Sequence, residues 1–129
     1  MFQNLSIFKM AHAMATHAGT RQAVVAQNVA NADTPGYAAR DITPFHDLVS
    51  SGPRVAGQVA TRDGHLHGQM SGAQSDVFNR DGALSDPNGN SVSLELEMLH
   101  SVATKRQHDR ALAIYKSSMT ILRTSLGKR

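Results

Sequence analysis

The sequence has no cysteine and no tryptophan, and aromatic residues make up only 5% of its 129 positions. Without cysteine, the chain forms neither a disulfide framework nor a thiolate metal site. No stretch approaches the roughly 18 consecutive apolar residues expected of a membrane span. The length is that of one domain, but the few aromatic residues and a mean hydropathy of −0.31 leave little material for a dense globular core.

Positive charge is concentrated at the C-terminal end of the chain, although the net charge is only +3. Residues 105–129 hold seven Lys or Arg against Asp109 alone, so the remainder of the chain carries a small negative charge. Glu95 and Glu97 precede these cations in one helical pattern, an order that complements a helix dipole. The distribution therefore favours a solvated helix over a nucleic-acid interface.

Residues 1–32 are predicted to form one helix because they contain no proline, one glycine and many alanines. Apolar residues recur at every third or fourth position of this segment. Those that we expect to face a partner helix are Leu5, Phe8, Val25 and Val29. A 30-residue helix is about 45 Å long, and a rod of this length needs a partner to bury its apolar stripe.

Residues 33–90 have a different composition, with most of the glycines, all four prolines and seven Asp. Their apolar side chains are too few to offset the entropy of ordering so long a segment. We expect this variable segment to be disordered in the monomer, with short strands near residues 52–66, and to gain order mainly from neighbouring molecules.

Residues 91–129 are predicted to form a second long helix, with Asn90, Ser91 and Ser93 as candidate N-caps and Gly127 just beyond its end. An apolar stripe at three- and four-residue spacing comprises Leu94, Met98, Leu112, Tyr115, Met119, Leu122 and Leu126. The fold class is therefore mainly α. Two long terminal helices pack as an antiparallel, coiled-coil-like pair, joined by a long irregular segment.

A tight turn follows the first helix. Asn28 and Asn31 lie one helical turn apart, and asparagine at a helix end satisfies free carbonyls or stops the helix. Thr34-Pro35-Gly36-Tyr37 has the signature of a type II turn, since proline sets φ at the first central position and glycine allows positive φ at the second.

Two stretches carry a resemblance to a known family. QNVANADTPGYAARDI, residues 27–42, resembles the signature of bacterial flagellar rod and hook axial proteins, in the variant found in proximal-rod subunits. DPNGNSVSLELEM, residues 86–98, resembles the turn into the C-terminal helix of that family, and the length agrees with the short rod subunits.

The resemblance implies a structural subunit of the proximal rod of the flagellar basal body, which polymerises through its terminal helices and has no catalytic role or cofactor. It implies contacts with itself, other rod subunits, the inner-membrane ring and export-gate adaptors. It also implies export through the flagellar type III apparatus without a cleaved signal peptide, to a rod that spans the periplasm. On this basis the assembly motif comprises Asn28, Asn31, Asp33, Pro35, Gly36, Tyr37, Arg40 and Phe45.

Other functional patterns are weaker. Asp86-x-Asn88-x-Asn90 with Glu97 at the twelfth position resembles a calcium loop, but Ser91 stands where glycine is required. His65 and His67 would share one face of a strand, without an obvious third metal ligand. No motif positions a nucleophile or base, and no small-molecule substrate is indicated. The alternative to a rod subunit is a cytoplasmic helical-hairpin adaptor or secretion chaperone.

Overall fold

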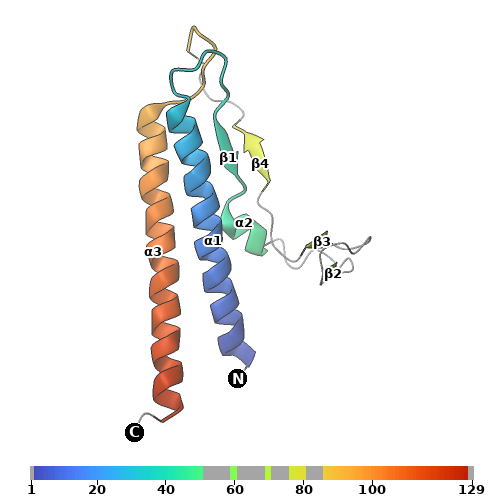
Figure 1. The fold of residues 1–129 in the computed structure, drawn as a ribbon, viewed down its shortest axis with the longest axis vertical. Coiled ribbons are helices and arrows are strands. Elements are labelled where there is room, and N and C mark those ends of the chain that lie inside the picture. Colours follow the sequence, from blue (N-terminus) through green and yellow to red (C-terminus); the bar gives the residue numbers. More distant parts are fainter. Residues whose placement is uncertain (1, 51–58, 61–68, 71–75, 81–85, 128–129) are drawn as a thin grey trace.

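The computed structural model describes residues 2–50, 59–60, 69–70, 76–80 and 86–127, with side chains for residues 6–49, 76–80 and 86–127. Two long helices, α1 (Phe2–Ala30) and α3 (Leu94–Ser125), lie side by side and dominate the molecule (Figure 1). The chain is thus mainly helical, as predicted. None of the described helices is both long and apolar enough to cross a membrane.

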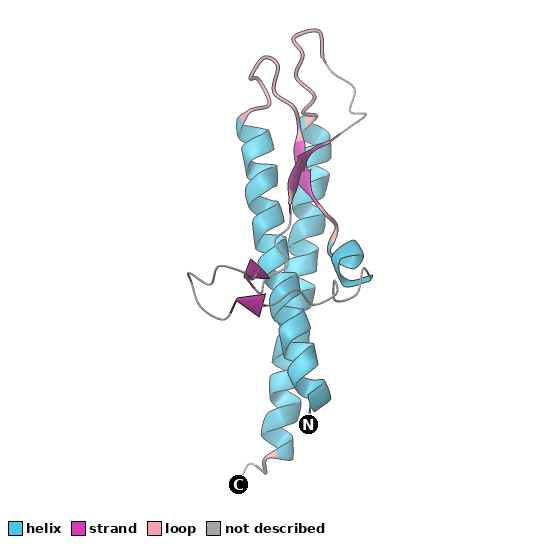
Figure 2. Ribbon diagram, turned by 90° about the vertical axis from the view of Figure 1, so that its right-hand side faces the viewer, coloured by secondary structure: helices cyan, strands magenta, loops and turns pink. Residues whose placement is uncertain are grey.

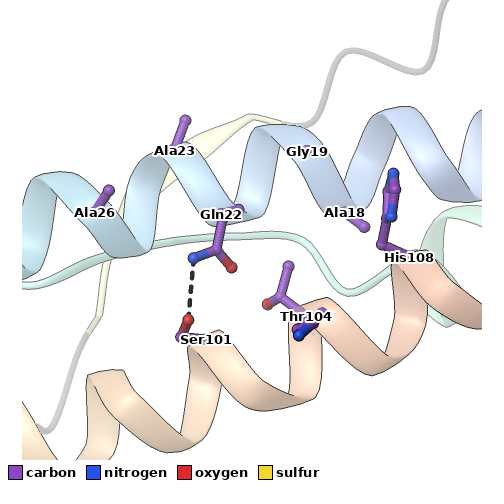
Figure 3. Close-up of a pocket in the computed structure, with 9 residues that line it drawn as sticks. Ala18, Gly19, Gln22, Ala23, Ala26, Ser101, Thr104 and His108 are labelled. Atoms are coloured by element: carbon purple, nitrogen blue, oxygen red, sulfur yellow. Dashed lines mark hydrogen bonds between the residues drawn. The ribbon is translucent and has the colours of Figure 1, made fainter.

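Contacts between the two helices show that they run in opposite directions. The rings of Phe8 and Tyr115 meet edge to face, with 5.2 Å between centroids. Further along α1, Gln22 Nε2 donates a hydrogen bond to Ser101 Oγ at 3.0 Å (Figure 3). Because residue numbers rise along α1 as they fall along α3, the pair is an antiparallel hairpin.

Each helix has a row of buried residues at seven-residue spacing. On α1 the row is Ala11, Ala18 and Val25, beside the buried His17, Val24 and Asn28, and on α3 it is Glu97, Thr104 and Ala111. A seven-residue repeat of contact positions is the period of a coiled coil. Most of these side chains are small, which lets the two helices approach closely.

The large apolar side chains expected in the seam are mostly exposed in the single chain. Those at least two-fifths exposed are Val29, Leu94, Met98, Leu112, Tyr115 and Leu126, whereas Phe8, Met119 and Leu122 are half-buried and Val25 is buried. The side chain of Leu5 falls outside the described part. Phe8 and Tyr115 do meet between the helices, whereas the most deeply buried positions of α3 are Glu97, Thr104 and Ala111. The seam as a whole stays a prediction.

Helix ends agree closely with the predicted caps. Ser93 is the N-cap of α3, and its Oγ accepts a hydrogen bond from the Leu96 N–H at 3.5 Å. At the other end Gly127 has φ +66° and donates its N–H to the Thr124 carbonyl at 3.3 Å. The helices are somewhat shorter than predicted, because α1 ends at Ala30 and α3 begins at Leu94.

The described residues between the two long helices form two small sheets and a short helix (Figure 2). In the first sheet β1 (Arg40–Ile42) pairs antiparallel with β4 (Val77–Asn79). In the second, β2 (Val59–Ala60) pairs parallel with β3 (Gln69–Met70). Helix α2 (Phe45–Ser50) follows β1. Of the strands expected near residues 52–66, β2 is described, and the rest of that range lies outside the described residues.

Residues 33–50 have a defined path along α1 within the single chain, where the sequence led us to expect order mainly from neighbouring molecules. Ala39 and Ile42 have no exposed surface. The difference has a polar cause: side chains of α1 and α3 bind the backbone of this segment, as the next subsection details. Whether the remainder of residues 33–90 gains order on assembly stays a prediction.

Candidate functional site

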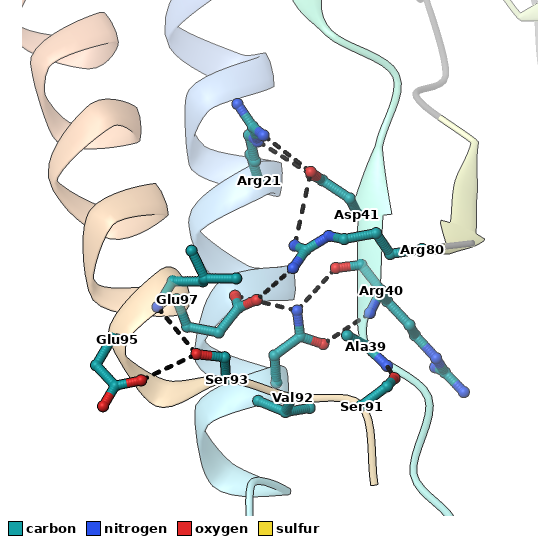
Figure 4. Close-up of polar contacts among 12 residues, drawn as sticks. Arg21, Ala39, Arg40, Asp41, Arg80, Ser91, Val92, Ser93, Glu95 and Glu97 are labelled. Carbon is teal, nitrogen blue, oxygen red and sulfur yellow. Dashed lines mark hydrogen bonds and ion pairs between the residues drawn. The ribbon is translucent and has the colours of Figure 1, made fainter. Parts of the chain in front are cut away.

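The candidate site is the junction at which the end of α1, strand β1 and the start of α3 meet (Figure 4). Asn28, on the last turns of α1, is fully buried there. Its Oδ1 accepts the Arg40 N–H at 3.0 Å, and its Nδ2 donates to the Arg40 carbonyl at 2.7 Å. The side-chain amide thus pairs with one residue of β1 as a neighbouring strand would, and ties the strand to the helix.

The same amide joins α1 to α3. Asn28 Nδ2 also donates to Glu97 Oε2 at 3.1 Å, and the Glu97 side chain has no exposed surface. The other oxygen, Glu97 Oε1, accepts a hydrogen bond from Arg80 Nη1 at 3.0 Å. A buried carboxylate is costly unless it is paired and hydrogen-bonded, and these two partners supply both.

Arg80 and Arg21 bracket a second carboxylate, that of Asp41 on β1. Arg21 binds it with two hydrogen bonds, Nε to Oδ1 at 3.0 Å and Nη2 to Oδ2 at 2.9 Å. Arg80 Nη2 lies 3.8 Å from Asp41 Oδ2. Two arginines and two acids therefore form a connected cluster that links α1, β1, α3 and the residue after β4.

The environment of Asp41 favours its charged form. Burial alone would raise the pKa of the carboxyl group. The Arg21 hydrogen bond, the Ile42 N–H and the charges of Arg21 and Arg80 outweigh burial, so the pKa of Asp41 lies below its ordinary value. The carboxylate is thus held ionised as a structural link between β1 and α1.

Asn90, in the loop that precedes α3, binds the turn that follows α1. Its Nδ2 lies 2.9 Å from the Asn31 carbonyl, 2.7 Å from that of Ala32 and 2.9 Å from that of Thr34. These carbonyls belong to the turn that follows α1, which ends at Ala30. One buried amide from a residue nearly sixty positions away binds them, so the turn is fixed to the start of α3.

The predicted type II turn is present. The Tyr37 N–H donates to the Thr34 carbonyl at 3.3 Å, and Gly36 has φ +72°. Gly36 also donates its N–H to the Asn88 carbonyl at 3.1 Å, in the loop that precedes α3. In that loop Gly89 has φ +81°, and a Cβ there would lie 3.4 Å from Gly36 Cα. The two loops therefore pack backbone against backbone.

The assembly motif divides into an inner and an outer part. Asn28 is buried in the polar cluster, while Asn31 binds the Gln27 carbonyl through Nδ2 at 2.8 Å. Asp33, Pro35 and Gly36 are exposed at the tip of the hairpin. The two aromatic residues of the motif pack on nearby side chains. The Tyr37 ring centroid lies 5.8 Å from the Arg40 guanidinium carbon, and the Phe45 ring centroid lies 5.5 Å from that of His17.

Sequence reasoning missed three parts of this site: Arg21, Asp41 and Arg80. It also assigned Glu97 to a solvated face or a calcium loop, whereas Glu97 is buried and committed to Asn28 and Arg80. The spacing of Glu97 from Thr104 and Ala111 was the available signal, since an acid at a buried heptad position requires a partner.

No metal-binding group of three or more His, Asp or Glu occurs among the described residues. Glu97, the twelfth position of the calcium-loop pattern, is occupied by its contacts with Arg80 and Asn28. Asn90 and Asn88, at the fifth and third positions, bind backbone groups of the junction. His65 and His67 lie outside the described residues.

The fold and the junction define a paired-helix protein whose polar site sets how its two long helices meet. A family model described as "Flagella basal body rod protein" matches residues 13–37, from the middle of α1 through the turn. The chain is 33% identical over 120 residues to flagellar basal body rod protein FlgB of Agrobacterium fabrum, an alignment that covers 89% of this chain and 88% of that protein. The chain therefore belongs to the flagellar basal body rod protein family, a structural family, which confirms the resemblance.

Proposed function

We propose that the chain is a structural subunit of the proximal rod of the flagellar basal body, and that it polymerises through its terminal helices into the axial drive shaft. Membership of the rod family supports a place in the basal body. The observation that carries the polymerising role is the exposed apolar surface of α3, which the single chain leaves uncovered.

Exposed apolar side chains occur along nearly the whole of α3. Those at least half exposed are Leu96, Met98, Leu99, Val102, Ile121 and Leu126. A concentration of exposed large apolar side chains is typical of a surface that contacts another molecule. In a rod subunit, adjacent subunits would cover these side chains.

The junction gives this surface a fixed geometry. Asn28, Glu97 and Asn90 fix the register of α1 against α3 before any contact with a neighbour. A subunit that enters a helical lattice as a preformed hairpin loses less conformational entropy on binding than two free helices would. We infer that the assembly motif shapes the subunit rather than binding a small molecule.

The partners that follow are other rod subunits, further copies of this chain, and the inner-membrane ring and export-gate adaptors at the base of the rod. Delivery would use the flagellar type III apparatus, without a cleaved signal peptide. The role needs no cofactor, nucleic acid or catalytic step.

The decisive experiment replaces the native gene by a tagged version and analyses detergent-extracted basal bodies by mass spectrometry and electron cryomicroscopy. We expect this chain in the preparation, with density for its two helices in the rod beside the inner-membrane ring. Intact basal bodies without the chain would refute the proposal.

A variant test addresses the surface directly. Ile121 is 58% exposed on α3, so Ile121→Asp should leave the circular dichroism of the monomer unchanged but abolish motility. Thr120→Asp, at the adjacent exposed position, is the matched control and should swim. Full motility of the Ile121→Asp strain would show that this end of α3 makes no essential contact.

The second candidate is a cytoplasmic hairpin adaptor or secretion chaperone. The closed junction is the observation that favours an adaptor, because the hairpin forms within one chain. An adaptor would form a stoichiometric complex in the cytoplasm and be missing from basal bodies. A rod subunit would be found in basal bodies.

A further inference from the structure

A groove runs between α1 and α3 and has a volume of about 520 Å³ (Figure 3). Its α1 wall is built from the small residues Gly19, Ala23 and Ala26, and its α3 side includes Thr104 and Lys105. This wall lies on the opposite flank of α1 from His17 and Asn28, which bind the backbone of residues 40–43. The segment after the turn therefore leaves the groove uncovered.

The groove is open because most residues of its α1 wall are glycine or alanine. A Cβ added to Gly19 would meet nothing within 4 Å. Gln22 and Ser101 bind each other across the gap, so their polar groups are satisfied. Beside His108, Lys105 is the only ionisable residue of the lining, and within the described part of the chain it has no ion-pair partner. The site is thus apolar with one free positive charge at its edge.

A surface with the complementary properties lies on α3 itself. Met98, Leu99 and Val102 are 59%, 66% and 50% exposed and form an apolar ridge. Glu95 precedes Leu99 by one helical turn and is exposed on the same face. Its Oε2 accepts a hydrogen bond from Ser93 Oγ at 3.1 Å, but no cation pairs with it among the described residues. The ridge thus combines large apolar side chains with an acid, and the groove combines open space with a base.

We propose that the groove of one copy of this chain binds the Leu99 ridge of a second copy, with Glu95 of the ridge paired with Lys105 of the groove. This inference rests on the proposed rod function and names the surfaces that the subunits use. Small residues let the second helix approach closely, and the charge pair sets its register. Because the two surfaces differ, the contact is heterologous and repeats from copy to copy, as a rod requires.

The absence of cysteine from the chain allows a direct test by disulfide cross-linking. Ala23→Cys in the groove and Leu99→Cys on the ridge are placed in one chain, which replaces the native copy in a flagellated strain. Mild oxidation of extracted basal bodies should then give linked dimers and higher oligomers that disappear on reduction. Only contacts between copies give these bands, since a bond within one chain leaves its mass unchanged.

The matched control combines Leu99→Cys with Gln27→Cys, which is also exposed on α1 but does not line the groove. It should give no oligomers. If the chain is present in basal bodies but the Ala23–Leu99 pair links no better than this control, the groove proposal is wrong and the rod function stands. If the chain is absent from basal bodies, the rod function fails, and linking of the concentrated purified protein decides the groove contact separately.

A charge exchange tests the register without cysteine. Glu95→Lys and Lys105→Glu should each reduce motility, because each places like charges at the contact. The double variant restores the pair with its signs reversed and should recover motility. Circular dichroism of all three monomers controls for folding. A double variant as impaired as the worse single variant, with unchanged helix content, would overturn the pairing of Glu95 with Lys105.

Discussion

Asn28 and Glu97 meet at 3.1 Å across the helix pair, and neither side chain has any exposed surface. The contact joins residues 69 positions apart in the sequence. It places a polar link at the point where other paired helices carry apolar residues. Such a link is costly to form unless all its members are satisfied, and it then fixes one register among several that small apolar residues would tolerate.

Replacing Asn28 by alanine should lower the free energy of unfolding by about 2–4 kcal/mol, because it leaves the Arg40 peptide and Glu97 without their buried partner. Urea unfolding followed by circular dichroism measures this loss. Gln27→Ala changes the exposed neighbour on the same helix and should differ little from the native chain. Equal stability of the two variants would mean that the junction is not closed in solution.

Removing Arg80 alone should lower the free energy of unfolding more than removing both members of its ion pair. Arg80→Met leaves Glu97 charged and buried, which should cost about 2–4 kcal/mol. Adding Glu97→Gln removes that charge while keeping an acceptor for Asn28, so the double variant should recover part of the loss. A double-mutant cycle from urea unfolding gives the coupling energy, and additive losses would contradict the contact.

The stability of the chain should depend on pH through Asp41. Its pKa is lower in the folded chain than the ordinary value of about 3.9, so its contribution is complete above that value and is lost as the pH falls through the folded pKa. Asp41→Asn should therefore be less stable than the native chain at pH 7. The difference should shrink below about pH 4, as measured by urea unfolding across that range. Asp33→Asn, at an exposed position, should show no such convergence.

Two glycine-to-alanine substitutions should change the stability of the chain in opposite directions. Gly89 has φ +81° and faces Gly36 Cα, so Gly89→Ala should cost about 1–3 kcal/mol through backbone strain. Gly19 lies inside α1 with open space around it, so Gly19→Ala should stabilise the monomer by about 0.5–1 kcal/mol. Thermal unfolding of both variants checks the pair of signs.

The sequence predicts those parts of the structure that local chemistry determines. Pro35 and Gly36 specify their turn because φ at each position is set by the residue itself, and Gly127 marks the end of α3 for the same reason. The two helices follow from composition and spacing. These features depend on neighbours within a few positions, so a single sequence contains them.

Contacts between segments far apart in the sequence were harder to predict. The stripe from Leu94 to Leu126 correctly identifies an apolar surface, but periodicity does not distinguish a surface that meets α1 from one that meets another molecule. Arg80 joins Glu97 only because β4 pairs with β1, and a three-residue strand among glycines carries no pattern of its own. The polar cluster thus depends on an arrangement that the sequence does not display.

The described contacts of the junction do not involve the segment between α2 and β4. They involve residues 21–41, 80 and 86–97, so they are made without that stretch. Doubling the length of a flexible connection adds only about 0.6 kcal/mol of closure entropy. The hairpin therefore tolerates large changes in the length of the segment between α2 and β4, so that segment can diverge or expand without altering the helices that meet at the junction.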